Sequence, residues 1–155
     1  MNQDYEDLFR AFNEHQVKYL IIGAYAVIYY AEPRYTKDLD VWVDPSRENA
    51  DRVWKALAEF GAPLEGVSIE DFSNPELIYQ IGVEPNRIDI MMAVPGLEFA
   101  SAWDRKVTSL YGKERMSILN LDDLIHAKKT TDRESDRLDL KLLEKAKKAG
   151  QEEPQ

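Results

Sequence analysis

The chain has 155 residues, 44% of them hydrophobic and 32% charged, which is ordinary for a globular protein and excludes a disordered or fibrous chain. This length supports one sizeable core and is too short for two. We therefore expect a single domain over residues 1–149, with helices from about residue 120, and a disordered tail over 150–155. The absence of cysteine excludes a disulfide scaffold, a thiolate zinc site and a cysteine nucleophile.

The net charge of −9 is unevenly distributed along the chain. Residues 128–148 hold eight basic and five acidic side chains, whereas residues 1–127 hold 12 basic and 22 acidic ones. Such an acidic surface repels polyphosphate backbones, which disfavours long nucleic acid as a partner. The basic segment is either a solvated helix face or a place that receives a small anion. The acidic N-terminus is unlike a signal peptide and no apolar run is long enough to span a membrane, so we expect a cytoplasmic protein without a membrane partner.

The N-terminal half is predicted to alternate helices and strands. Apolar residues at helical spacing indicate the first helix, and a β-branched run that ends at Gly23 indicates a buried strand. Pro33 ends the next helix, and the third is bounded by an N-cap at Ser46 and a glycine stop at Gly61. The predicted elements are a helix over 4–14, a strand over 17–22, a helix over 24–30, a strand over 37–43 and a helix between Ser46 and Gly61.

The C-terminal half is predicted to contain two hairpins followed by helices. Turn-rich residues separate each pair of strands, and Asn120 with Asp123 resembles a capping box that opens a helix. The final helix is expected to bury Leu138, Leu142 and Leu143. The predicted elements are strands over 76–82 and 87–94, a short helix over 97–105, strands over 107–111 and 114–119, and helices over 120–129 and 134–148. The fold class is therefore α/β (α+β): a small mixed β-sheet flanked by helices, with a helical C-terminal part.

Two aspartates on one predicted strand are the first candidates for chemistry. Because side chains alternate along a strand, Asp38 and Asp40 project to the same side. Two carboxylates this close repel each other unless a positive charge lies between them, and a divalent ion is the usual solution. With no cysteine and only two histidines in the chain, oxygen ligands indicate Mg²⁺ or Mn²⁺ rather than zinc. Trp42 shares this side of the strand, where it could either belong to the core or stack on a base.

A third carboxylate lies in a later apolar run, Arg87-Ile88-Asp89-Ile90-Met91. Burying Asp89 there costs several kcal/mol unless it is paired or bound to a metal. Its neighbours Ile88 and Ile90 point the other way, so Asp89 can share the face of the two earlier aspartates. Three carboxylates from two strands are the arrangement that a two-metal phosphoryl or nucleotidyl transfer requires.

Gly23 ends a strand and leads directly into a helix. This junction leaves backbone N–H groups at a helix N-terminus, where they and the helix dipole favour a phosphate. The small side chain of Ala24 keeps the approach open. A glycine here could equally serve only a tight strand-to-helix turn.

These motifs together resemble the nucleotidyltransferase superfamily (DNA polymerase beta-like fold), above all its small, mostly uncharacterised bacterial and archaeal members, some of them from toxin–antitoxin systems. Ile22-Gly23-Ala24, Arg34-x-Thr36-x-Asp38-x-Asp40 and Ile88-Asp89-Ile90 carry the resemblance. Asp123-Leu124-Ile125, followed by Lys128, Arg133, Asp136 and Asp139, is similar to the family's C-terminal helical pattern. The likeness extends over about residues 17 to 143.

The resemblance implies a nucleoside triphosphate, with ATP favoured, held by Mg²⁺ on the aspartates at 38, 40 and 89. Asp89 is then also the candidate general base for an acceptor hydroxyl. Gly23 and the amide of Ala24 would hold the β- and γ-phosphates. Ala24 replaces the family's second glycine or serine, which keeps the amide but removes a hydroxyl contact or some flexibility.

Four further side chains have two open interpretations each. Arg34 and Thr36 either contact a phosphate or hold their loop. Lys128 and Arg133 either reach the site or form ion pairs with nearby aspartates on the last helices.

The activity also has two open interpretations. The first is a metal-dependent enzyme that moves a nucleoside monophosphate from a triphosphate to an acceptor hydroxyl. The alternative is a non-catalytic nucleotide-binding or toxin–antitoxin interaction module. In either case, a homodimer or a partner protein could complete the cleft of so short a chain.

Overall fold

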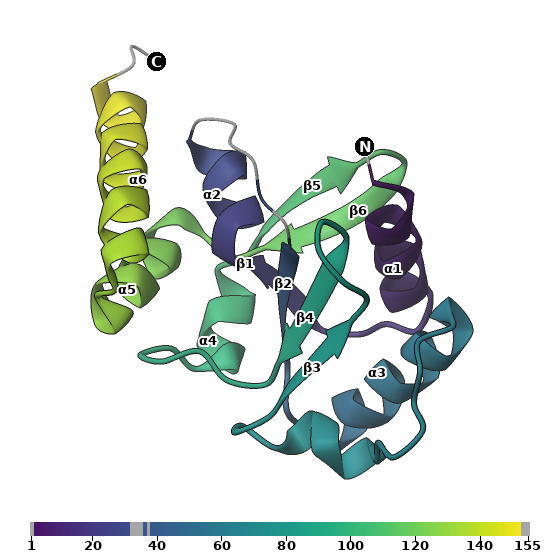
Figure 1. The fold of residues 1–155 in the computed structure, drawn as a ribbon. Coiled ribbons are helices and arrows are strands. Elements are labelled where there is room, and N and C mark those ends of the chain that lie inside the picture. The colour runs from purple at the N-terminus through teal and green to yellow at the C-terminus, as the bar shows by residue number, and fades with distance from the viewer. Residues whose placement is uncertain (1, 32–35, 37, 153–155) are drawn as a thin grey trace.

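The computed structural model describes residues 2–31, 36 and 38–152 (Figure 1). These residues form a six-stranded sheet in the order β3-β4-β2-β1-β6-β5, with helices around it. This arrangement confirms the predicted mixed sheet flanked by helices. The elements are α1 (Gln3–Glu14), β1 (Tyr19–Ile22), α2 (Gly23–Tyr30), β2 (Asp38–Val43), α3 (Arg47–Phe60), the 3-10 helix η1 (Ile69–Ser73), β3 (Ile78–Ile81), β4 (Arg87–Met91), α4 (Phe99–Asp104), β5 (Val107–Tyr111), β6 (Glu114–Ile118), α5 (Leu121–Thr131) and α6 (Glu134–Glu152).

The sheet is mixed because its central strands come from different parts of the chain. Strand β1 runs antiparallel to β2 and parallel to β6, and β2 runs parallel to β4. The outer strands β3 and β5 each form a hairpin with the strand beside them, as predicted. The pairing of β2 with β4 sets Asp40 opposite Asp89, although 48 residues of chain separate them.

The two faces of β2 bury different partners. Leu39, Val41 and Val43 are buried on the face that includes Tyr19 of β1, and α1 packs two phenylalanine rings against that tyrosine. On the other face, Trp42 is 1% exposed and meets Phe99 of α4 edge to face. Trp42 is therefore a core residue and cannot stack on a base.

The expected caps begin and end the helices. Ser46 Oγ accepts from the amide of Asn49 at the start of α3, and Gly61 ends that helix in the left-handed region at φ +92°. Asn120 Oδ1 accepts from the amide of Asp123 at 2.7 Å. The capping box is only half formed, because the carboxylate of Asp123 instead accepts from Arg105 at 3.0 Å.

The last two helices form a pair that packs on α2 (Figure 1). Leu143 of α6 is fully buried, but Leu138, which was expected to be buried, is 59% exposed. The buried stripe of α6 instead includes Asp136 and Asp139. Apolar periodicity misses this stripe because two of its members are carboxylates. Helix α6 also continues to Glu152, beyond the predicted end at residue 148.

Among the residues that the structure describes, no helix combines the length and the apolar character that crossing a bilayer requires.

Candidate functional site

Three carboxylates meet on one face of the sheet, where β2 and β4 lie side by side. Asp40 and Asp89 are register partners, and alternation along β2 places Asp38 on the same face. One oxygen from each of the three side chains lies within 4.8 Å of the others. Among the described residues, no other three acidic or histidine side chains come this close. We call Asp38, Asp40 and Asp89 the acidic triad.

Arg87 contacts two members of the acidic triad, and this role was not predicted from the sequence. Its Nη2 donates to Asp38 Oδ2 at 3.0 Å and to Asp89 Oδ2 at 3.3 Å. The guanidinium therefore joins two of the three carboxylates. The available signal was its position two residues before Asp89, because residues i and i+2 of a strand share a face.

The acidic triad has electrostatic signs of a cation site. Burial, and then the negative charges of Asp38 and Asp89, raise the pKa of Asp40 to about 7. Burial likewise raises the pKa of Asp89, although Arg87 opposes this shift. Asp89 Oδ1 lies 3.2 Å from Arg87 Nε, but the two atoms are poorly aligned, and each is buried without a hydrogen bond. Such an orphaned carboxylate oxygen lacks a partner that a bound cation would supply.

The charge balance around the acidic triad suits a divalent ion. With all three carboxylates ionised, as a bound cation would favour, the one guanidinium of Arg87 leaves a net charge of −2 in this group. Every candidate ligand atom is a carboxylate oxygen, the donor type that Mg²⁺ and Mn²⁺ prefer. The residues present therefore fit the metal that the resemblance implies.

Gly23 approaches the acidic triad from the start of α2. Its φ of +67° lies in the left-handed region. A Cβ at this position would come within 2.2 Å of Asp40 Oδ2, so only glycine allows this approach. The first turn of α2 has no side-chain cap, because its N-cap residue is Ile22. Gly23 and Ala24 line the hollow beside the acidic triad, so uncapped amides lie next to it.

Four charged side chains of α5, α6 and their connection form a second group, which we call the C-terminal charge cluster. Lys128 Nζ lies 3.3 Å from Asp136 Oδ1 and 3.2 Å from Asp139 Oδ2, and all three side chains are nearly buried. Arg133 Nε donates to Asp136 Oδ2 at 2.9 Å. Burial alone would raise the pKa of Asp136, but hydrogen bonds from Arg133 and Thr131 lower it well below its usual range.

The ion pairing expected as the alternative role of Lys128 and Arg133 is thus present. The same two residues also line the hollow that contains the acidic triad, so ion pairing does not take them away from it. The net charge of the C-terminal charge cluster is zero, which leaves the negative charge of the hollow on the acidic triad.

Thr36 and Arg34 precede β2. The hydroxyl of Thr36 donates to the backbone carbonyl of Asp38 at 3.2 Å, with Asp38 Oδ1 at 3.5 Å. This contact joins Thr36 to the start of β2. Arg34 lies outside the described residues.

The acidic triad opens into a hollow of about 530 Å³, within the size range of small-molecule sites. Its walls come from β1, α2, β2, β3, β4, the segment after β4, the residue after β6, and the last two helices with their connection. It brings Gly23, Ala24, Lys128 and Arg133 to the same space as the acidic triad.

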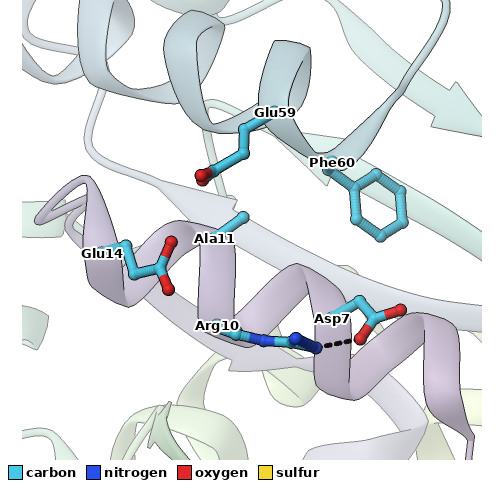
Figure 2. A pocket seen from close by; sticks show the side chains of 6 residues that line it. All are labelled: Asp7, Arg10, Ala11, Glu14, Glu59 and Phe60. Carbon is cyan, nitrogen blue, oxygen red and sulfur yellow. Dashed lines mark hydrogen bonds and ion pairs between the residues drawn. The ribbon is translucent and has the colours of Figure 1, made fainter.

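A different hollow, between α1 and α3, lacks these features (Figure 2). Figure 2 shows Arg10 turned along α1 toward Asp7, with which it forms an ion pair, while Glu59 extends from the facing helix. Glu59 is itself 3.0 Å from His15. Among the described residues, Arg10 is the one cation that lines this hollow and it is already paired, which disfavours a phosphate site; the three carboxylates there do not converge as metal ligands.

Comparisons with known proteins bear on the fold. No family model matches the sequence, and no curated protein matches it. A solved structure of lincosamide antibiotic adenylyltransferase LnuA, with lincomycin bound, is similar with a TM-score of 0.58. That similarity covers 93% of this chain and 96% of the other, at 15% sequence identity. The chain therefore has a nucleotidyltransferase-like fold, as the sequence motifs implied.

Proposed function

We propose that this protein transfers a nucleoside monophosphate from a nucleoside triphosphate to an acceptor hydroxyl. The observation that carries the proposal is the acidic triad, placed beside the uncapped start of α2 in one hollow. A fold shared with an adenylyltransferase supports it.

The acidic triad would hold Mg²⁺ or Mn²⁺. When bound, the ion neutralises charge that develops at the α-phosphorus and positions the triphosphate. Arg87 holds Asp38 and Asp89 together, so it keeps these ligands ordered while no metal is bound. Thr36 contributes by holding Asp38 through its backbone.

The triphosphate would lie along the wall formed by α2 and the last two helices. The backbone N–H groups of Gly23 and Ala24, at a helix N-terminus, would donate hydrogen bonds to phosphate oxygens. Lys128 and Arg133 line the same hollow and are further candidates to contact the phosphates, as is Arg34, which precedes β2 in the sequence. These phosphate contacts are part of the proposal.

In the transfer step, the acceptor oxygen forms a bond to the α-phosphorus. The bond from that phosphorus to the oxygen bridging the α- and β-phosphates breaks, and pyrophosphate leaves with the electron pair. The proton of the acceptor hydroxyl passes to the carboxylate of Asp89. Raising the pKa of a carboxylate makes it a stronger base, and burial raises the pKa of Asp89.

The acceptor that best fits the charge of the chain is a small hydroxyl-bearing molecule. A net charge of −9 opposes a long polyanion such as RNA. A lincosamide and an aminoglycoside are suitable first acceptors to test, the former because the similar structure is a lincosamide adenylyltransferase. ATP is the first donor to test for the same reason.

Incubation with each α-labelled nucleoside triphosphate, Mg²⁺ or Mn²⁺, and a panel of acceptors tests the proposal. We expect label transfer that is lost in Asp40→Asn and retained in Asp104→Asn. The second variant removes an equal charge from an exposed residue that does not line the hollow. Transfer that survives in Asp40→Asn would refute the assignment.

The non-catalytic alternative has a separate signature. A nucleotide-binding or toxin–antitoxin interaction module would bind triphosphate in a metal-dependent way without releasing pyrophosphate. Ala24 supports this alternative, because its side chain cannot donate a hydrogen bond to a phosphate. Light scattering after gel filtration distinguishes a monomer from the homodimer or partner complex that could complete the cleft.

A further inference from the structure

A second hollow, of about 390 Å³, lies at the other end of β1 from Gly23. Its walls come from the end of α1, the start of β1, α3, α4, and the β5–β6 hairpin with the residue before it. Of the residues that the structure describes, four basic ones line it and no acidic one does. They are Lys18, Arg52, Lys106 and Arg115. We call this hollow the basic pocket.

The two arginines of the basic pocket are unusual in this acidic protein, because within the described residues neither has a carboxylate partner. Eight of the nine arginines lie within the described residues, and six of these eight form ion pairs. The two that form none there, Arg52 and Arg115, both line the basic pocket. Lys18 and Lys106 likewise form no ion pair within the described part of the chain. Their mutual repulsion is an unfavourable term that a bound anion would remove.

Trp103 orders one of these cations. Lys106 Nζ lies 4.0 Å from the centroid of the indole ring, a cation–π distance, and Lys18 Nζ lies 6.0 Å away. Phe99 stacks on the same indole at 5.9 Å with an interplanar angle of 20°. The indole is therefore already in contact with a stacked ring and an ammonium group, which leaves it poorly placed as a platform for a nucleobase.

Neutral hydrogen-bond donors complete the lining. Thr108 and Ser117 are cross-strand partners of the β5–β6 hairpin, and Gln16 lies just after α1. Within the described residues, none of these three side chains forms a hydrogen bond. Hydroxyl and amide donors among cations are the groups that bind phosphate oxygens.

We propose that the basic pocket binds a compact phosphorylated small molecule through its phosphate groups. Its volume is that of a small-molecule site, and its charge selects for an oxyanion. Single-stranded nucleic acid is disfavoured, because its binding relies on free aromatic platforms and on a surface that attracts a long polyanion. The basic pocket and the acidic triad lie at opposite ends of β1, so the bound molecule is separate from the proposed transfer reaction.

Calorimetric titration of the full chain with sodium pyrophosphate, at low salt and with EDTA present, tests the proposal. EDTA removes divalent ions and so prevents metal-dependent binding at the acidic triad. We expect a dissociation constant of roughly 1 mM or lower. In the double variant Arg52→Gln with Arg115→Gln, binding should be at least about tenfold weaker. The matched control Lys113→Gln with Lys141→Gln removes two exposed, unpaired charges outside the pocket, and should change affinity less than about twofold.

Further variants and a competing ligand test whether charge at the basic pocket accounts for the binding. Double replacement of the two arginines by lysine should retain most of the binding, and circular dichroism should show that every variant is folded. Asp40→Asn should bind pyrophosphate as the parent does. The proposal is overturned if pyrophosphate does not bind, if the arginine and control variants lose binding equally, or if a 12-residue oligothymidylate binds at least about tenfold more tightly than pyrophosphate.

Discussion

Replacing Gly23 by alanine isolates the contact between α2 and the acidic triad. The new Cβ would lie 2.2 Å from Asp40 Oδ2, whereas real Cβ atoms essentially never come closer than 3.0 Å. The carboxylate must therefore move by at least 0.8 Å, or α2 must move away from β2. Alanine must also adopt φ +67°, a left-handed conformation that costs roughly 1–2 kcal/mol.

Gly61→Ala is the matched control for this substitution. Gly61 also has a left-handed φ, of +92°, but nothing lies within 4 Å of a Cβ built there. Both variants therefore carry the backbone penalty, and only Gly23→Ala displaces a carboxylate. A side chain forced away from its rotamer costs a further ~1 kcal/mol. We expect Gly23→Ala to lower the free energy of unfolding by about 2–3 kcal/mol, and Gly61→Ala by about 1–2 kcal/mol.

Metal binding should separate the two variants more clearly. A small divalent ion tolerates little displacement of its oxygen ligands, so we expect Gly23→Ala to weaken Mn²⁺ binding at least about tenfold. Gly61→Ala should bind Mn²⁺ as the parent does. Urea unfolding and electron paramagnetic resonance of Mn²⁺ give the two measurements. Equal stability and equal Mn²⁺ affinity in the two variants would refute the inferred contact.

Three further substitutions test separate parts of the structure. Arg87→Gln removes the cation between two carboxylates, so calorimetry should show that Mn²⁺ binds several-fold more tightly. The free energy of unfolding without metal should fall by about 2 kcal/mol. Weaker Mn²⁺ binding in the variant would contradict this reasoning. Asp136→Asn should cost about 2–3 kcal/mol at pH 7, because it leaves Lys128 nearly buried with one partner fewer. The pKa of Asp136 is lowered on folding, so its contribution is present above about pH 4, and the urea midpoints of parent and variant should converge as the pH falls below that value. Leu143→Ala should lower stability by about 3 kcal/mol and Leu138→Ala by less than about 0.5 kcal/mol, whereas equal losses in thermal unfolding would contradict the observed burial.

Local rules were sufficient to predict most elements and the membership of the acidic triad. Alternation along a strand placed Asp38 and Asp40 on one side, and an aspartate between two isoleucines identified Asp89. Both inferences depend on a period of two residues, which any strand enforces. The caps at Ser46 and Gly61 were also predictable, because each cap depends only on neighbouring backbone groups.

The missed features all depend on contacts between distant segments. Leu138 has the spacing of a core residue, yet α6 turns Asp136 inward because Lys128 of α5 neutralises it. Arg87 shares a face of β4 with Asp89, but its hydrogen bond to Asp38 requires the pairing of β4 with β2. The basic pocket is also invisible in the sequence, because its four cations come from four separated segments of a chain with a net charge of −9.

The order of residues thus establishes which chemical groups the protein has and, through short-range periodicity, which of them share a strand face. Which groups meet in space depends on strand pairing and helix packing, because these set distances that no local pattern encodes. Gly23 shows this division: its permissive backbone is a property of one residue, whereas its fit against Asp40 exists only after β1 pairs with β2.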